Sequence, residues 1–203
     1  NVLFQLAEAD PKLYANRAWR DAAIRRGTLS AARRFVDLAA NGAFEGKGMD
    51  DWITARQIAG LMSEHAELRT HVYQLLEKGP RTPGLALLAQ AVAEAPDADG
   101  LLLLIKHNPS FISRLTIERA VTEHVPSEDL KGAYNIVPVP AIELRQKLLA
   151  MTVAGNRTDA ATHCLYQIDE IRDEYGAPDS EPRHPDLASG KQWPDMRGLD
   201  HMP

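Results

Sequence analysis

Apolar residues recur along this chain every three or four positions, which is the period of an α-helix that turns one face to a core. Six segments carry such a stripe: Leu29, Ala32, Val36 and Ala39; Ala55, Ile58, Ala59 and Met62; Leu68, Val72, Leu75 and Leu76; Leu85, Leu88, Val92 and Ala95; Ala141, Leu144, Leu148 and Met151; and Ala161, Cys164, Leu165, Ile168, Ile171 and Tyr175. No segment shows the sustained alternation of apolar and polar residues that is typical of a half-buried strand. The pattern therefore predicts an all-α protein.

Prolines and polar residues separate the stripes and mark where helices begin. Asp10-Pro11, Thr82-Pro83 and Asn108-Pro109 each place a side-chain acceptor before a proline, an order that is typical of a helix start. Short helices joined by tight turns pack side by side as antiparallel hairpins. We expect these hairpins to form a short α-solenoid or an irregular bundle.

One internal similarity favours the solenoid. Residues 91–99 (AVAEAPDAD) are similar to residues 120–129 (AVTEHVPSED). The offset is about 30 residues, slightly short for a helical repeat. The similarity occurs only once, and a chance match explains it as well as a repeat does.

The sequence predicts four parts in the chain. They are a helical-repeat body over residues 1–131, a proline-containing connector over 132–140, a C-terminal helical hairpin over 141–176 and an extended tail over 177–203. The prolines of the connector bar a helix interior and favour extended backbone. The tail is rich in proline and poor in aliphatic residues, so it cannot form its own core. We expect Trp193 to anchor the tail on the body, and a disordered tail is the alternative.

Composition narrows the function classes. The 203 residues include 28 acidic and 23 basic side chains, a net charge of −5, whereas dedicated nucleic-acid binders carry a basic excess. The longest apolar run, residues 101–105, is far shorter than a membrane-spanning helix. Cys164 is the single cysteine, which favours a reducing, cytoplasmic setting. Because residues 1–5 contain no initiator Met and no targeting signal, we expect the chain to be a piece of a longer polypeptide.

The candidates for catalytic chemistry have simpler interpretations. Residues 42–48 (GAFEGKG) lack the spacing and the final Ser or Thr of a phosphate loop, which favours an inter-helix loop. Cys164 lies on an apolar stripe, and His163 points about 100° away from it around a helix, which favours a core cysteine. The seven histidines show no metal-binding spacing. We therefore expect no catalytic, cofactor-binding or metal-binding residue here, and no enzyme activity.

Charged residues near the C-terminal end form two acidic pairs. Asp169-Glu170 and Asp173-Glu174 are separated by one helical turn, and Arg172 lies between them. Paired carboxylates can perform acid–base catalysis. Partial balance by the arginine favours a solvated helix face instead.

A local basic excess marks the N-terminal part of this acidic chain. Its candidate partner-contact residues are Arg17, Arg20, Arg33 and Arg34. Nearby, Arg25-Arg26 precedes Gly27, where cations stabilise the negative end of a helix dipole. A structural role is the favoured interpretation, and contact with nucleic acid or an acidic protein is the alternative.

The C-terminal residues carry a family resemblance. Residues 166–176 (YQIDEIRDEYG), 181–186 (EPRHPD) and 189–194 (SGKQWP) resemble the end of large bacterial NACHT or STAND-type NTPases, and the preceding body is similar to their helical, HEAT-like repeats. The resemblance implies a multidomain switch protein, often in antiviral defence, whose repeat region senses a ligand before the NTPase domain assembles. No residue of the family's nucleotide site is present in this chain.

Together these observations favour a non-enzymatic recognition or regulatory segment. It would bind a protein ligand, or pack on the adjoining NTPase domain of its parent chain, through the extended surface that stacked hairpins offer. Oligomers would form through the parent NTPase, and no membrane contact is expected. The first alternative is nucleic-acid or acidic-partner binding through residues 17–34, and the second is a small helical enzyme that uses His163, Cys164 or His184.

Leu88 tests the predicted core directly. Replacing Leu88 with Ala should lower the free energy of unfolding by about 2 to 5 kcal/mol, because a cavity would remain in the core. Denaturant titration measures this change. A loss below about 0.5 kcal/mol would show instead that this stripe faces solvent.

Overall fold

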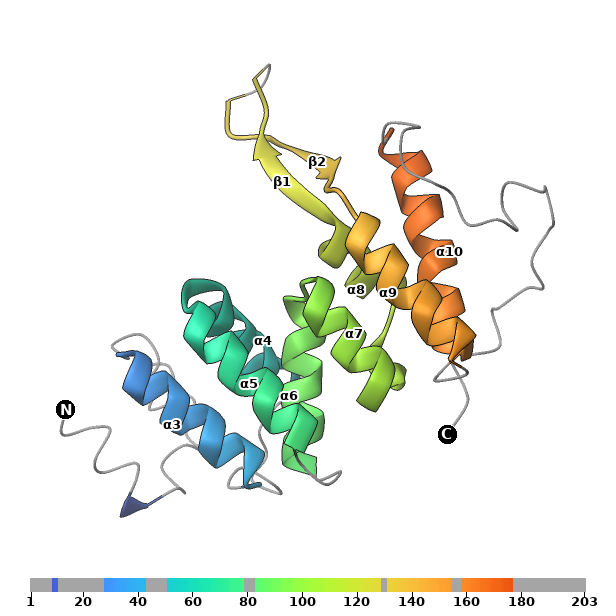
Figure 1. The fold of residues 1–203 in the computed structure, drawn as a ribbon. Coiled ribbons are helices and arrows are strands. Elements are labelled where there is room, and N and C mark those ends of the chain that lie inside the picture. The colour runs from blue at the N-terminus through green and yellow to red at the C-terminus, as the bar shows by residue number, and fades with distance from the viewer. Residues whose placement is uncertain are drawn as a thin grey trace. The chain divides into compact units, whose positions relative to one another are not determined.

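The computed structural model describes residues 9–10, 28–42, 51–78, 83–128, 131–154 and 158–176. The chain divides into two compact units, residues 1–96 and residues 97–203. Both units are mainly helical in the described ranges (Figure 1). The predicted all-α class is confirmed, with one small two-stranded sheet in addition.

Four helices make up the described part of the first unit. They are α3 (Leu29–Ala40), α4 (Asp51–Glu64), α5 (Ala66–Lys78) and α6 (Pro83–Glu94). α6 packs against α3 and α4, and α5 contacts all three other helices. The largest fully buried side chains in this core are Phe35, Ile58, Met62, Leu68 and Leu88. The predicted stripes supply most of these residues, so the helical period correctly identified the buried faces.

The predicted helix starts have different outcomes. Pro83 is the first residue of α6 as expected, and Pro11 lies outside the described residues. Pro109 begins only a short 3-10 helix, η2 (Pro109–Phe111), and the Asn108 side chain makes no capping bond there. A Pro after a polar residue fits a 3-10 turn as well as an α-helix, because both lack a partner for the first N–H.

Gly84 lets α6 approach the end of α3 closely. A Cβ atom at this position would lie 2.6 Å from the carbonyl oxygen of Ala40, and it would also meet the carbonyl oxygen of Ala39. These are backbone atoms, so they cannot rotate out of the way. The absence of a side chain at Gly84 therefore determines how these two helices meet.

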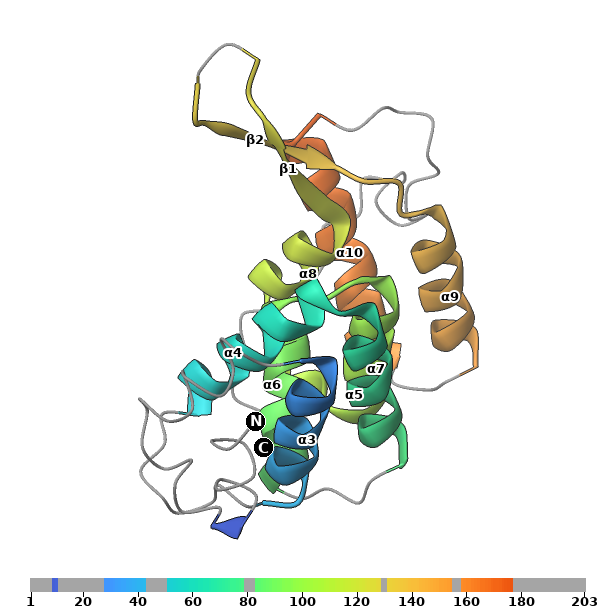
Figure 2. The ribbon, with the colours of Figure 1, turned by 90° about the vertical axis from the view of Figure 1, so that its left-hand side faces the viewer.

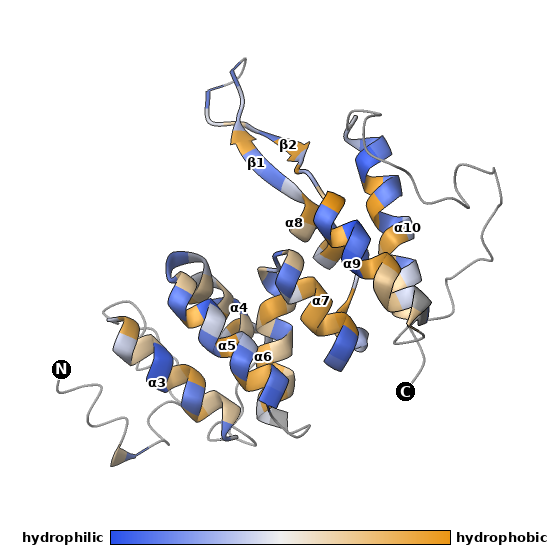
Figure 3. Ribbon diagram, viewed as in Figure 1, coloured by the Kyte–Doolittle hydropathy of each residue, from blue (hydrophilic) through white to orange (hydrophobic). Residues whose placement is uncertain are grey.

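The second unit combines helices with a hairpin. Its described elements are α7 (Ala98–His107), η2, α8 (Arg114–Val121), β1 (Thr122–Pro126), β2 (Tyr134–Pro138), α9 (Ile142–Val153) and α10 (Thr158–Glu174). Four helices contribute to one apolar core, which includes Leu101, Ile105, Ile117, Leu148 and Leu165. Figure 3 shows hydrophobic residues along most of α7, in agreement with its burial.

The hairpin extends beyond the helices of the second unit in both ribbon views (Figures 1 and 2). β1 and β2 pair antiparallel, with Thr122 opposite Pro138 and Pro126 opposite Tyr134. β2 lies within the predicted connector, residues 132–140. The prolines of this connector led to the prediction of extended backbone, which β2 has. The pairing of β2 with β1 was not predicted, because neither strand shows a sustained alternation of polarity.

The internal similarity does not correspond to equivalent structures. Ala91 and Ala120 both lie near the ends of helices, α6 and α8. After α6, Asp97 caps the start of another helix by accepting from the N–H of Gly100 at 2.8 Å. After α8, the chain continues directly into a strand. The two segments therefore share a helix ending but not the element that follows it.

The four-part division expected from the sequence stays a prediction. The two compact units of the structure divide the chain at a different position. The units meet between Pro96 and Asp97, within the predicted body over residues 1–131. α9 and α10 pack on each other, at the position of the predicted helical hairpin. In the described ranges, no helix has both the length and the apolar character to span a membrane.

Two glycines offer a matched test of helix packing in the first unit. Gly84→Ala should destabilise the protein, because the added methyl group collides with backbone carbonyls of α3. Gly60→Ala should stabilise it by about 0.5 to 1 kcal/mol, since a Cβ at Gly60 has no neighbour within 4 Å. Denaturant melts of both variants measure the difference. Equal stabilisation by the two would contradict the close approach at Gly84.

Candidate interaction surface

A buried ion pair joins the last two helices of the second unit. The Arg145 side chain on α9 and the Asp169 side chain on α10 are each only 5% exposed. Arg145 Nη1 donates to Asp169 Oδ1, and Arg145 Nη2 donates to Asp169 Oδ2 at 3.4 Å. Two parallel bonds fix the relative orientation of a guanidinium and a carboxylate more firmly than one bond. This pair therefore determines how α9 lies on α10.

A second buried arginine connects α10 to the base of the hairpin. Arg172 Nη1 donates to the carbonyl oxygen of Val139 at 3.0 Å, and the N–H of Val139 donates to the carbonyl oxygen of Val121 at 2.8 Å. Val121 ends α8 and Val139 directly follows β2. We call Arg145, Asp169 and Arg172 the base clamp, because Arg145 and Asp169 join α9 to α10 and Arg172 ties α10 to Val139 at the base of the hairpin.

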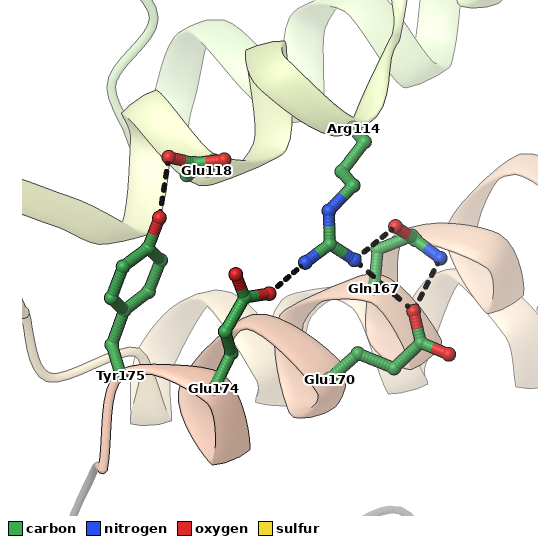
Figure 4. Close-up of polar contacts among 6 residues, drawn as sticks. All are labelled: Arg114, Glu118, Gln167, Glu170, Glu174 and Tyr175. Carbon is green, nitrogen blue, oxygen red and sulfur yellow. Dashed lines mark hydrogen bonds and ion pairs between the residues drawn. The ribbon is translucent and has the colours of Figure 1, made fainter.

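Arg114 forms an exposed polar network between α8 and α10 (Figure 4). Its Nη1 donates to Gln167 Oε1 and to Glu170 Oε2, both at 3.3 Å, and its Nη2 pairs with Glu174. The acceptors come from one face of α10, at positions separated by three and four residues. Each exposed pair contributes little to stability on its own, but together they align α8 along α10.

Tyr175 completes the contact between α8 and the end of α10. Its hydroxyl group donates to Glu118 Oε1 at 2.9 Å, as Figure 4 shows. This hydrogen bond raises the pKa of Tyr175, and partial burial and the charges of Glu118 and Glu174 raise it further, whereas Arg114 lowers it. The phenol therefore stays protonated and able to donate well into the alkaline range.

The hairpin and α9 present apolar side chains to solvent. Tyr134 on β2 is 65% exposed, and on α9 Ile142 is 44% and Leu149 is 37% exposed. Ile142 and Leu149 are separated by two helical turns and therefore share one face of α9. The opposite face buries Leu144 and Leu148. The second unit thus offers a surface with several exposed apolar contact points.

The candidate residues chosen from the sequence lie elsewhere. Arg33 and Arg34 are exposed on α3 in the first unit. Arg17, Arg20 and Trp193 lie outside the described residues. The structure therefore tests neither the full basic cluster nor the proposed tail anchor.

The cysteine is a core residue, as the sequence favoured. Cys164 is fully buried on α10 within the apolar core of the second unit. Burial raises the pKa of its thiol to about 12, so the reactive thiolate is not formed near neutral pH. Among the described residues, no group of three or more His, Cys, Asp or Glu side chains is arranged to hold a metal ion.

The interpretation of the acidic pairs as a solvated face is wrong for Asp169. This carboxylate is buried against Arg145, and Arg172 is buried as well. Glu170 and Glu174 are exposed, as expected. The available signal was the position of Asp169 and Arg172, each of which directly follows an apolar-stripe residue of α10. Arg145 has the same relation to Leu144 on α9 and was not predicted as a buried residue.

Comparison with known proteins gives one match. Residues 116–194 match the family model described as NACHT C-terminal Alpha/Beta 2. The match begins within α8, includes the hairpin, α9 and α10, and extends past Gly176. It supports a NACHT-associated C-terminal region in this chain, which is the part of the resemblance that is confirmed. Neither the curated proteins nor the solved structures gave a match.

The base clamp yields a prediction about stability. Asp169→Ala should lower the free energy of unfolding by about 3 to 5 kcal/mol, because it leaves the guanidinium of Arg145 buried without its partner. Glu170→Ala is the matched control. Its exposed pair with Arg114 should contribute about 1 kcal/mol or less.

Denaturant titration followed by circular dichroism measures both losses. A double replacement, Arg145→Met with Asp169→Leu, should recover most of the stability, since it removes both buried charges together. Equal losses for Asp169→Ala and Glu170→Ala would contradict the burial of the pair.

Proposed function

We propose that this chain is a non-enzymatic C-terminal segment of a larger NTPase, and that it packs on the NACHT NTPase domain of its parent chain or binds a protein ligand. The observation that carries the proposal is the family match over residues 116–194. This stretch includes the hairpin and the two helices, α9 and α10, that contain the buried charged side chains. A segment built to position a surface, rather than to perform chemistry, serves recognition or regulation.

The second unit provides the contact surface in this proposal. Ile142 and Leu149 form an apolar strip on the outer face of α9, and Tyr134 adds an aromatic side chain on the hairpin. Aromatic and aliphatic side chains of this kind supply most of the binding energy at protein interfaces. The occupant we propose is the adjoining NTPase domain.

Further features of the proposal rest on the resemblance and the composition. The helices of the first unit would act as HEAT-like repeat pairs, and the parent protein would belong to bacterial antiviral defence. A cytoplasmic setting fits a chain with one buried thiol and no other cysteine.

A second candidate is contact with an acidic partner through α3. Arg33 and Arg34 are both exposed there, as an electrostatic contact requires. Such binding would weaken steeply with salt, because each neutralised phosphate or carboxylate releases counterions.

The direct test is binding between the 203-residue chain and the purified NACHT NTPase domain of its parent protein, measured by fluorescence anisotropy. Ile142→Glu with Leu149→Glu should weaken binding at least tenfold, because two charges would be buried in an apolar interface. Both positions are exposed, so the fold should remain intact. Arg33→Glu with Arg34→Glu is the control and should leave the affinity unchanged.

Two results would contradict the proposal. Loss of binding in the arginine variant alone would favour the acidic-partner alternative. Hydrolysis of ATP or GTP by the isolated chain would contradict its non-enzymatic role.

A further inference from the structure

The register of the hairpin determines which backbone groups face outward. The N–H of Ser127 donates to the carbonyl oxygen of Ala133 at 2.9 Å, and the N–H of Val139 donates to that of Val121 at 2.8 Å. Hydrogen-bonded and non-hydrogen-bonded pairs alternate along an antiparallel ladder. The non-bonded pairs, whose N–H and C=O groups turn away from the hairpin, are therefore Thr122 with Pro138, His124 with Ile136, and Pro126 with Tyr134.

The outer edge of β2 has a short row of unpaired backbone groups. Tyr134 and Ile136 each keep an outward N–H and an outward carbonyl group. Within the described ranges, no residue outside the hairpin bonds to the main chain of either one. Beyond them, Pro138 has no N–H to donate, and Gly132 already lies in the turn, with a φ of +84°. Pairing at this edge is therefore confined to residues 134–136.

This edge is complementary to a second copy of itself. Two β2 strands can pair antiparallel about a twofold axis, with Tyr134 opposite Ile136 of the second copy. Each copy then contributes two N–H and two carbonyl groups, and every one of these groups has a partner. Asn135 lies on the axis, opposite Asn135 of the second copy. A shift of the register by two residues would set an outward group against Pro138 or Gly132 and lose bonds.

Charges favour β2 over β1 for such self-pairing. The side chains of β2, residues 134–138 (YNIVP), are all uncharged, and two Asn135 amides on the axis can each donate to and accept from the other. The equivalent pairing of β1, through the outward groups of Thr122 and His124, would set Glu123 opposite Glu123 of the second copy. Like charges directly opposite each other destabilise a sheet. Of the two edges, that of β2 is therefore the one suited to a second copy.

The hairpin also gains support from such a contact. An isolated two-stranded ribbon is marginally stable in water, and this one extends beyond the helices of its unit (Figures 1 and 2). Two paired hairpins make a four-stranded sheet. The ring of Tyr134, which is 65% exposed, would then lie across from Ile136 of the second copy. Cross-strand pairs of an aromatic and a β-branched residue stabilise a sheet.

We propose that two copies of this chain associate through the outer edges of their β2 strands and form a four-stranded antiparallel sheet. The ladder is short, so the dimer is weak and depends on concentration. The backbone groups that pair are separate from the apolar strip of Ile142 and Leu149 on α9. Association of two copies and binding to the NTPase domain can therefore be tested independently.

Sedimentation velocity of the full chain over a concentration series measures the dissociation constant of the dimer. Asn135→Asp and Asn135→Lys should each raise this constant at least tenfold, because like charges would face each other across the axis, in a non-bonded pair whose side chains lie close together. An equimolar mixture of the two variants should associate at least tenfold more tightly than either variant alone, since its charges are opposite. Asn135 is exposed, so the fold should tolerate both changes.

Two proline variants provide a matched comparison of the two edges. Ile136→Pro removes an outward N–H from β2, and His124→Pro removes one from β1, directly across the hairpin. Neither change removes a bond within the hairpin. The Ile136 variant should lose dimerisation, whereas the His124 variant should keep the dissociation constant of the natural sequence. Ile142→Glu with Leu149→Glu should also leave this constant unchanged.

Three results would contradict self-pairing at β2. A natural chain that stays monomeric at every concentration would overturn the proposal. Equal dissociation constants for the natural sequence, the two Asn135 variants and their mixture would also overturn it, because the contact would then lie elsewhere. Loss of the dimer in the Ile142 and Leu149 variant alone would assign the contact to α9 instead.

Discussion

The second unit depends on a pair of charges that has been taken out of water. Burying a guanidinium and a carboxylate costs several kcal/mol per ion, and only close, two-point pairing offsets that cost. Arg145 and Asp169 meet this condition by pairing end-on between α9 and α10, through both terminal nitrogens of the guanidinium group. The buried charge of Arg172 is partnered in another way, because its guanidinium group donates to the backbone carbonyl of Val139. The bond from Arg172 to Val139 then ties the base of the hairpin to α10.

The two units use different means of reaching a unique structure. Every charged residue found buried in the described ranges lies in the second unit, and the buried polar residue of the first unit is Thr54. An apolar core tolerates many substitutions if volume is kept, whereas a buried ion pair requires particular partners at particular positions. The stretch that matches a known family is also the one that contains these specific contacts.

Helical periodicity was sufficient to predict the class of the fold and most of the buried faces. It failed at the hairpin, because β1 and β2 are short strands that each end in proline and show no sustained alternation of polarity. It also misjudged Asp169, since a helical pattern locates a charged residue near a buried face without revealing a partner on another helix. Arg145 became identifiable as the partner of Asp169 only when the packing of α9 on α10 was known. The C-terminal resemblance succeeded where periodicity could not, because it rests on particular residues.

The burial of Cys164 gives the molecule a built-in reporter. No other cysteine is present in the chain, and this one is in the core shared by α7, α8, α9 and α10. A thiol reagent can reach it only in states that open this core, so its labelling rate follows the opening of the second unit alone. The first unit, residues 1–96, contains no cysteine and therefore does not react with the same reagent. Chemical labelling can therefore resolve the opening of one half of the chain without introducing any substitution.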